Sequence, residues 1–175
     1  MILLFTGNGK GKTTAALGQM FRAAGRGKKT LMIQFIKGPW ISGEDEFAKR
    51  YNIPKENFEI RKLGKGFVGI LEDNLPREEH EKAAEDALQA FVEAEKSGEW
   101  HTIVLDEINV AASLGLLKID NALNAIKNFP PDNILVMTGR NAPQEFMNAA
   151  DLVTEMKEVK HPFNDGEKAK YAVEF

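Results

Sequence analysis

A glycine-rich segment near the start of the chain limits the folds that the chain can adopt. The sequence TGNGKGKTT at residues 6–14 overlaps the end of the apolar run ILLFT at residues 2–6 and leads into an amphipathic pattern that continues to about Ala24. A short, continuous apolar run is typical of a strand that is buried on both faces. A strand, a glycine-rich turn and a helix N-terminus form an anion cradle, because the inward N–H groups and the helix end attract phosphate. The sequence therefore predicts a P-loop nucleotide-binding fold.

This loop departs from the usual P-loop pattern at its first position. The usual pattern is glycine, four residues and Gly-Lys-Ser/Thr. Here Gly11, Lys12 and Thr13 are in place, but Thr6 stands where the leading glycine belongs. The motif assigns Lys12 to the terminal phosphate oxygens and the Thr13 hydroxyl to Mg²⁺, and Lys10 adds a second cation. A lysine- and glycine-rich surface turn is the alternative, but the strand and helix around the loop argue against it.

Strand-like and helix-like patterns alternate along the rest of the chain. The predicted strands are residues 2–6, 30–36, 58–63, 101–107, 133–140 and 152–156, and the predicted helices are residues 13–24, 77–96, 120–128 and 143–150. Strands separated by helices imply right-handed crossovers, so we expect one α/β domain, residues 1–175, with a mainly parallel sheet flanked by helices. Met20 and Phe21 belong to the predicted buried stripe of the first helix. Residues 38–76 and 157–175 have the weakest periodicity.

An acidic pair follows the most apolar of the predicted strands. In the sequence IVLDE, four apolar residues precede Asp106 and Glu107. Carboxylates at the carboxyl end of a parallel strand lie at the edge of the sheet where ligands bind, and they can hold Mg²⁺ directly or through water. Such a pair is otherwise common surface chemistry, but the P-loop favours the metal interpretation. These features indicate ATP or GTP with Mg²⁺, and the sequence shows no convincing residue to orient a nucleophile at the γ-phosphate.

Composition narrows the class of partner. The formal net charge of −3 provides no long-range attraction to nucleic acid or to acidic membranes. The chain has no cysteine, which excludes a disulfide and a thiolate metal site and suits a reducing cytoplasm. No apolar run approaches the roughly 20 residues that a membrane-spanning helix needs. We therefore expect a cytoplasmic protein that binds small molecules, without nucleic acid or membrane partners.

Several separated motifs, in the same order along nearly the whole chain, give this sequence a resemblance to the ATP:corrinoid adenosyltransferases of cobalamin biosynthesis. The motifs are FTGNGKGKTTAALG at 5–18, Arg22, QFIKGPW at 34–40, GE at 43–44, GF at 66–67, VLDE at 104–107, TGR at 138–140 and VKHPFNDGEKAKYAVEF at 159–175. The altered front of the loop is typical of that family. The resemblance implies a transferase in which Co(I) of a reduced corrinoid attacks the 5′-carbon of ATP and expels triphosphate. The corrinoid carries the difficult chemistry, so no protein nucleophile is required.

The resemblance also implies roles for individual residues. The triphosphate is held by the loop, which comprises Gly7, Asn8, Gly9, Lys10, Gly11, Lys12, Thr13 and Thr14. Lys12 offsets the charge of the triphosphate, and Thr13 holds Mg²⁺ together with Asp106 or Glu107. Arg22 and Arg140 are implied to act at the nucleotide. Arg22, however, lies roughly 13 Å beyond Thr13 along a helix with a rise of 1.5 Å per residue, so it cannot reach the same phosphates through that helix. A helix-surface arginine is the alternative interpretation.

Phe67 in the segment GKGFVG is the residue that the resemblance places against the corrinoid. In the family, an aromatic residue here displaces the lower axial ligand of the cobalt, which makes reduction to Co(I) easier. Family members often have a tryptophan two positions later, where this chain has Gly69. Either Phe67 acts alone, or one of Val68, Ile70 and Leu71 assists it. Core packing of Phe67 is the alternative.

The remaining expectations concern partners and competing functions. The family is commonly dimeric, and its chemistry implies an electron-donating flavoprotein. Trp40 is a candidate for lining a corrinoid face, with burial as the alternative, and His161 is interpreted as a structural or surface residue. Two competing functions remain at this point: another P-loop enzyme, such as a small-molecule kinase or NTPase, and a non-catalytic module that binds nucleotide or corrinoid.

Overall fold

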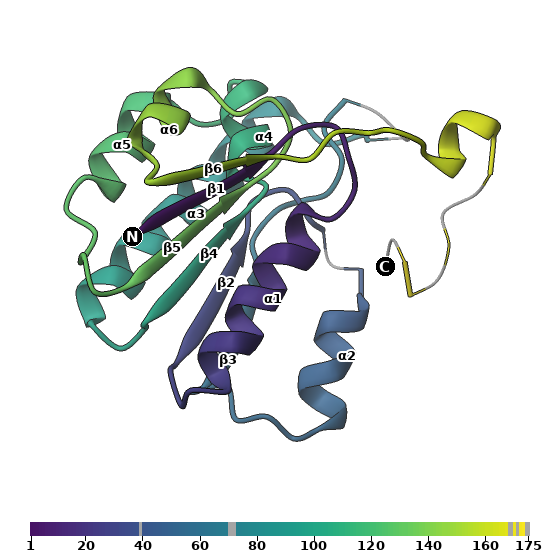
Figure 1. Ribbon diagram of the computed structural model, residues 1–175. Helices are drawn as coiled ribbons and strands as arrows, with labels where there is room; N and C mark the ends of the chain where they lie inside the picture. The colour runs from purple at the N-terminus through teal and green to yellow at the C-terminus, as the bar shows by residue number, and fades with distance from the viewer. Residues whose placement is uncertain (39, 70–72, 168–169, 171, 174–175) are drawn as a thin grey trace.

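Parallel strands form the central layer of the protein, whose computed structural model describes residues 1–38, 40–69, 73–167, 170 and 172–173 (Figure 1). The strands are β1 (Ile2–Thr6), β2 (Thr30–Gln34), β3 (Phe58–Lys62), β4 (Thr102–Asp106), β5 (Ile134–Thr138) and β6 (Leu152–Glu155). They form one sheet in the order β3-β2-β4-β5-β1-β6, and every pair of neighbours is parallel. The carboxyl ends of β1, β2, β4 and β5 therefore meet at one edge of the sheet.

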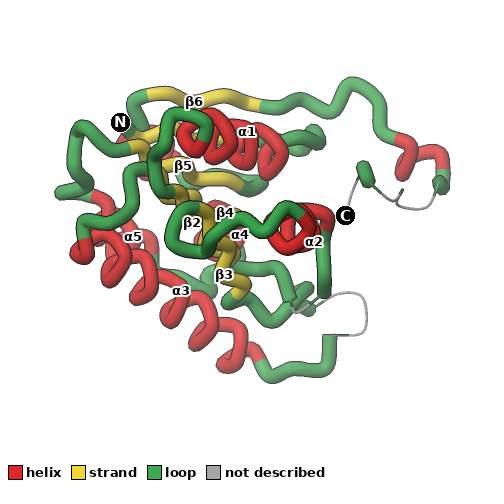
Figure 2. The backbone as a smooth tube through the Cα atoms, turned by 90° about the horizontal axis from the view of Figure 1, so that it is seen from below, coloured by secondary structure: helices red, strands yellow, loops and turns green. Residues whose placement is uncertain are grey.

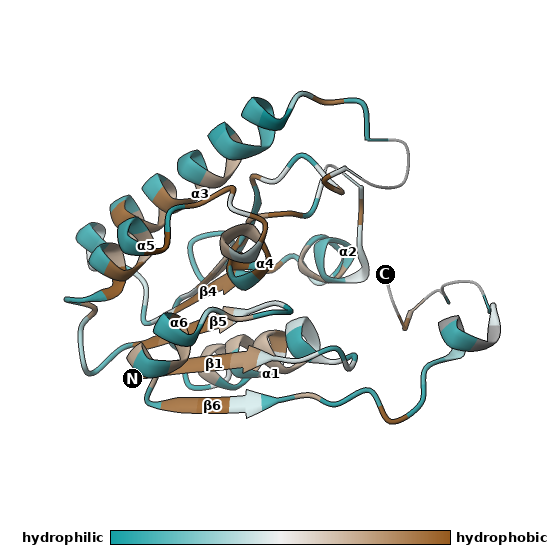
Figure 3. Ribbon diagram, turned by 90° about the horizontal axis from the view of Figure 1, so that it is seen from above, coloured by the Kyte–Doolittle hydropathy of each residue, from teal (hydrophilic) through white to brown (hydrophobic). Residues whose placement is uncertain are grey.

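Helices cover both faces of this sheet. They are α1 (Lys12–Ala24), α2 (Gly43–Arg50), α3 (Arg77–Ser97), α4 (Ile108–Ser113), α5 (Ile119–Ile126), α6 (Gln144–Ala149) and the 3₁₀ helix η1 (Pro162–Asp165). Helix α1 packs on one face, whereas α3, α4, α5 and α6 pack on the other, as the views along the sheet show (Figures 2 and 3). None of the described helices is long and apolar enough to cross a membrane.

The strands contribute to two cores because their side chains alternate between the faces. In β2, Leu31 and Ile33 join the core under α3, whereas Met32 joins the core under α1. Both β2 and β4 are buried along their whole length, as expected for strands that are covered on both faces. The apolar runs of the sequence thus correspond to the inner strands of a parallel sheet.

The α/β architecture predicted from the sequence is confirmed, and Met20 of α1 is buried as predicted, but the prediction was wrong for Phe21. Phe21 is 69% exposed, and the residues that face the sheet are Ala16, Met20 and Ala23. Lys12 explains the difference. It is buried at the start of the helix beneath the phosphate loop, so residues four and eight positions later face the sheet.

Two short helices, α2 and α4, were not predicted. No residue of α2 is buried, so its sequence carries no apolar stripe. Its start is marked instead by Ser42, whose backbone N–H and hydroxyl both contact the Asp45 carboxylate at 2.8 Å. Helix α4 begins directly after the acidic pair, within residues that are almost all buried. Its apolar residues are too few to show a helical period.

Candidate functional site

The phosphate loop lies between β1 and α1, and two of its glycines have backbone conformations that other residues avoid. Gly7 has a φ of +94° and Gly11 has a φ of +115°. A Cβ at position 7 would lie 2.5 Å from the carbonyl oxygen of Met156, so only glycine fits against the segment that follows β6. The N–H of Gly9 donates to the same oxygen at 2.7 Å. The segment after β6 therefore fixes one side of the loop.

Lys12 is buried at the first position of α1, and its ammonium group lies inside the loop. The Nζ atom donates to the carbonyl oxygens of Gly7 and Gly9, both at 2.7 Å. Burial lowers the pKa of Lys12 from its ordinary value of 10.5, and the negative charge of Glu107 partly offsets this effect. The loop carbonyls thus hold a cation at the place where phosphate oxygens can replace them as acceptors.

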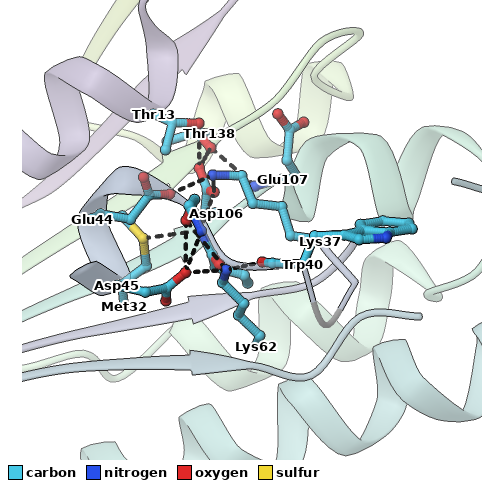
Figure 4. A network of polar contacts seen from close by, with 12 residues as sticks. Thr13, Met32, Lys37, Trp40, Glu44, Asp45, Lys62, Asp106, Glu107 and Thr138 are labelled. Atoms are coloured by element: carbon cyan, nitrogen blue, oxygen red, sulfur yellow. Dashed lines mark hydrogen bonds and ion pairs between the residues drawn. The ribbon is translucent and has the colours of Figure 1, made fainter. Parts of the chain in front are cut away.

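Asp106 joins three elements at the carboxyl edge of the sheet (Figure 4). Its side chain is fully buried at the end of β4. Its Oδ1 accepts hydrogen bonds from the hydroxyls of Thr13 at 2.9 Å and Thr138 at 2.7 Å, and its Oδ2 accepts one from Nε2 of Gln34 at 3.1 Å. The carboxylate therefore locks the first turn of α1 onto β2, β4 and β5. It also orients the Thr13 hydroxyl, whose proton points at Asp106.

Glu107 adopts a left-handed backbone conformation, with a φ of 64°. This conformation is uncommon for a residue other than glycine, and such strain often accompanies function. The backbone N–H of Glu107 donates to the hydroxyl of Thr138 at 3.0 Å, and the side chain lines the cavity described below. Burial, followed by the negative charge of Asp106, raises the pKa of Glu107 from 4.5 to about 7. The site therefore disfavours the ionised form of this carboxyl until a cation reaches it.

Glu107→Gln should stabilise the ligand-free protein at pH 8 but not at pH 4.5. Because the pKa of Glu107 is higher in the folded state, folding takes up a proton between pH 4.5 and about 7, and stability is lost as the pH rises through that window. Glutamine cannot ionise, so we expect a gain of about 1–3 kcal/mol at pH 8. Urea unfolding in EDTA, without nucleotide, measures it. An equal difference between the two proteins at both pH values would contradict the explanation.

A second cation lies close to Asp106. Lys37, in the segment after β2, forms an ion pair with Glu44 of α2 at 2.8 Å, and its Nζ lies 3.8 Å from Oδ2 of Asp106. Burial alone would lower the pKa of Lys37, but Asp106 and Glu44 outweigh burial and raise it. The side chain is therefore a cation at neutral pH. Through this contact, α2 is tied to the carboxyl edge of the sheet.

These groups border a cavity of about 1020 Å³. Its described lining comprises Gly9, Lys10, Gly11, Lys12, Thr13, Thr14, Leu17, Lys37, Gly43, Glu44, Phe67, Glu107, Arg140, Glu158, His161, Pro162, Asn164, Glu167, Ala172 and Val173. Most of the predicted site residues thus converge on one space. Gly7, Asn8 and the buried Asp106 are not part of the lining. Arg22 is also not part of it, because it is exposed farther along α1.

The segment after β3 presents Phe67 to this cavity. The side chain of Phe67 is 48% exposed, which excludes core packing as its role. Val68, in contrast, is partly buried and packs against the larger core. Ile70 and Leu71, the other candidates for assisting Phe67, lie outside the described residues.

A carboxylate anchors the backbone two residues after Phe67. Gly69 has a φ of +68°, and its N–H donates to Oδ2 of Asp73 at 2.8 Å. The ring Nε2 of the buried His80 lies 3.0 Å from the same oxygen. Asp73 therefore connects the turn that carries Phe67 to the first turns of α3.

The oxygen-rich set around Thr13 fits Mg²⁺. This ion prefers oxygen ligands, retains several waters and commonly takes one or two protein groups together with substrate phosphates. Thr13 and Glu107 both line the cavity, and Asp106 accepts a hydrogen bond from the Thr13 hydroxyl. No group of three or more His, Asp or Glu side chains suited to a metal occurs in the described part of the chain. Phosphate and water oxygens would have to complete the coordination.

Several residues that build the site lie in motifs that carry the family resemblance, but no role was predicted for them. They are Gln34, Lys37, Glu44 and Thr138. Gln34 and Thr138 end strands on the two sides of β4, and Lys37 and Glu44 follow the first of these strands. The available signal was their place in these motifs, together with the position of Gln34 and Thr138 at the ends of apolar runs. The strand order that brings them together could not be read from one sequence.

Comparisons with known proteins agree with this geometry. A family model described as ATP:corrinoid adenosyltransferase BtuR/CobO/CobP matches residues 1–175. A corrinoid adenosyltransferase of Pseudomonas aeruginosa is 38% identical over 175 residues, which cover 100% of this chain and 83% of the relative. A corrinoid adenosyltransferase of Escherichia coli strain K12 is 32% identical over 175 residues, which cover 100% of this chain and 85% of the relative.

A solved structure with a similar fold is the crystal structure of a KaiC-like protein from the archaeon Pyrococcus horikoshii OT3. The TM-score is 0.54 and the sequence identity is 15%, and the match covers 91% of this chain and 72% of that one. At this identity the likeness concerns the fold alone.

Proposed function

We infer the roles of the site residues from the premise that this chain belongs to the ATP:corrinoid adenosyltransferase family. It is an enzyme that joins the adenosyl group of ATP to a corrinoid. We propose that residues 7–14 hold the triphosphate of ATP and that Phe67 faces the corrinoid. The observation that carries this proposal is the shared cavity, which is lined by Lys12 and Thr13 as well as by Phe67.

The proposed reaction is one displacement at the 5′-carbon of ATP. The electron pair of Co(I) forms the cobalt–carbon bond, the bond between C5′ and its oxygen breaks, and its electrons leave with the triphosphate. Cobalt is formally oxidised from Co(I) to Co(III), and no proton transfer is needed. The protein has to bring the two substrates into line and to stabilise the charge that develops on the departing oxygen.

In this proposal the phosphate loop binds the leaving group as a whole. The Nζ of Lys12 exchanges the carbonyls of Gly7 and Gly9 for phosphate oxygens and offsets their growing charge. Thr13 and Glu107 hold Mg²⁺, which, when bound, neutralises charge on the triphosphate. Asp106 keeps the proton of the Thr13 hydroxyl turned away, so that the oxygen lone pairs remain available.

The two arginines differ in the support they have. Arg140 lines the cavity and is proposed to bind the nucleotide. Arg22 is exposed on α1 and does not line the cavity of its own chain. We therefore propose that Arg22 reaches a nucleotide only across the boundary of a homodimer. Sedimentation shows whether the wild type and Arg22→Ala are dimeric, and an activity assay shows the effect of the substitution. The variant should lose activity only if the protein is dimeric.

The function is tested by anaerobic incubation with chemically reduced cobalamin, Mg²⁺ and ATP. We expect the absorption change of cobalt–carbon bond formation and one triphosphate per adenosylated product. An ATP analogue with a methylene group between the β- and γ-phosphorus atoms should also react, because the broken bond is at C5′. ADP or orthophosphate without a cobalt–carbon bond would instead indicate a kinase or an NTPase. Binding of both substrates without turnover would indicate a non-catalytic module.

The supply of Co(I) requires a one-electron donor, and we propose an electron-donating flavoprotein as the partner. We also propose a cytoplasmic location, since the reaction consumes ATP and a reduced substrate. Replacing the chemical reductant with a reduced flavoprotein should sustain adenosylation when the corrinoid is supplied as Co(II). If several reduced flavoproteins do not sustain adenosylation while the chemical reductant still does, the proposal of a flavoprotein partner is contradicted.

A further inference from the structure

Two aromatic rings lie side by side on the surface next to the cavity. Trp40, between β2 and α2, is 61% exposed, and Phe67 is 48% exposed. Their ring centroids are 5.9 Å apart, with an angle of 36° between the ring planes. Figure 4 shows the Trp40 ring pointing away from the polar network around Asp106. Adjacent exposed aromatic rings lose hydrophobic stabilisation unless a ligand covers them, and such patches often mark binding sites.

The Trp40 ring lies against glycine backbone. A Cβ at position 38 would lie 2.8 Å from Cζ3 of Trp40, and a Cβ at position 66 would lie 2.7 Å from its Cη2. Only glycine therefore lets the indole lie against both segments. The Nζ of Lys62 donates to the backbone carbonyl of Trp40 at 2.5 Å and forms an ion pair with Asp45. The backbone of Trp40 is thus tied to β3, and its exposed ring lies against Gly38 and Gly66.

We propose that Trp40 is a corrinoid-binding residue that forms, together with Phe67, an aromatic face on which the flat macrocycle rests. This inference rests on the proposed function and specifies its second substrate site. A corrin ring offers an extended planar face, and aromatic side chains stack on such faces at low conformational cost. Phe67 lines the cavity that the phosphate loop borders, so a macrocycle on this face lies beside the nucleotide.

The residues next to Phe67 and Trp40 in the sequence fit this role less well. Val68 packs into the core, and Gly69 has no side chain to offer. Ile41 is 75% exposed, but an aliphatic side chain provides no planar face. Trp40 is the aromatic residue that contacts Phe67 among the described residues.

The test is the affinity of the full-length protein for cob(II)alamin, measured by anaerobic titration in the presence of Mg²⁺ and ATP. We expect Trp40→Ala to raise the Kd for cob(II)alamin about tenfold and Trp40→Phe to recover most of that loss. The Kd for ATP should not change. Gly38→Ala should give an intermediate loss, because its Cβ displaces the indole ring without removing it. In steady-state assays, the KM for the corrinoid should rise more than kcat falls.

Tyr51→Ala provides a matched control. Tyr51, the C-cap residue directly after α2, is 65% exposed and packs against Phe47 with 5.0 Å between the ring centroids, so it resembles Trp40 in exposure and in its aromatic neighbour. We expect this variant to bind cob(II)alamin as the wild type does. Wild-type affinity in Trp40→Ala, or an equal loss in Tyr51→Ala, would overturn the proposal. Absence of adenosylation by the wild type would instead refute the proposed function. The role of Trp40 is tested separately, because it is measured by binding and not by activity.

Discussion

Lys12→Ala should lower the turnover number for adenosylation by about 10²–10³-fold, which is the usual effect of removing a preorganised donor to a developing anion. The ammonium group of Lys12 is already fixed, by two hydrogen bonds of 2.7 Å, at the centre of the phosphate loop. When ATP binds, phosphate oxygens replace these two carbonyls as acceptors, so the ammonium group is already in place when charge develops on the triphosphate. The rate is measured in single turnovers with saturating Mg²⁺, ATP and chemically reduced cobalamin.

Lys10→Ala is the matched control for this prediction. Lys10 lines the same cavity but is exposed to solvent, where a charge is screened. We expect its removal to reduce the rate only a few-fold. Because Lys12 also holds the carbonyls of Gly7 and Gly9, the unfolding free energy of both variants should be measured in urea. Near-normal turnover in Lys12→Ala would show that another group stabilises the leaving triphosphate.

The parts of the fold that were predicted correctly are those that a local hydrophobic pattern in the sequence determines. Apolar runs mark strands that are buried on both faces, and the runs at β2 and β4 are buried along their whole length. The helix α2 has no buried residue, so hydrophobic periodicity could not reveal it. The buried face of α1 depends on Lys12, whose burial is a consequence of the loop. A hydrophobic pattern treats lysine as a polar, exposed residue, so it places the buried face of the helix too close to Phe21.

The residues of the candidate site also fall into a group that local sequence predicts and a group that depends on tertiary contacts. The loop and the pair of Asp106 and Glu107 were identified because their residues are adjacent in sequence. Gln34 and Thr138 were not, since they contact Asp106 only in the strand order of the folded sheet. The left-handed backbone of Glu107 also has no local signature, because the residue is not a glycine. Residue types indicated a nucleotide site, but tertiary contacts decide how each carboxylate functions.

Asp106→Ala should destabilise the ligand-free protein by about 3–5 kcal/mol. The side chain is fully buried, and its removal leaves the hydroxyl of Thr138 and the amide of Gln34 without their acceptor. It also takes away a counter-charge of Lys37. Urea unfolding at pH 8 in EDTA gives the change. Under the same conditions Glu107→Gln should have the opposite sign, so two neighbouring carboxylates are distinguished by one measurement.

Asp106→Asn separates the charge of this residue from its structural role. An asparagine has nearly the same volume, and its Oδ1 can still accept from Thr13 and Thr138. The side-chain NH₂ of the new asparagine would face the NH₂ of Gln34, and both groups are donors. The Oε1 of Gln34 is buried without a described partner, so a rotation of the Gln34 amide would bring this oxygen round to accept the hydrogen bond. We therefore expect a loss of only about 1 kcal/mol in stability.

Activity in Asp106→Asn should nevertheless fall about 10–100-fold, the range seen when a partner of a metal ligand is replaced. The reason is that a neutral amide polarises the Thr13 hydroxyl less and contributes no charge behind the proposed Mg²⁺ position. Raising the Mg²⁺ concentration should restore part of the rate. Full activity with unchanged Mg²⁺ dependence would mean that Asp106 only fastens α1 to the sheet, and Glu107 would then be the remaining candidate for the acidic partner of the metal.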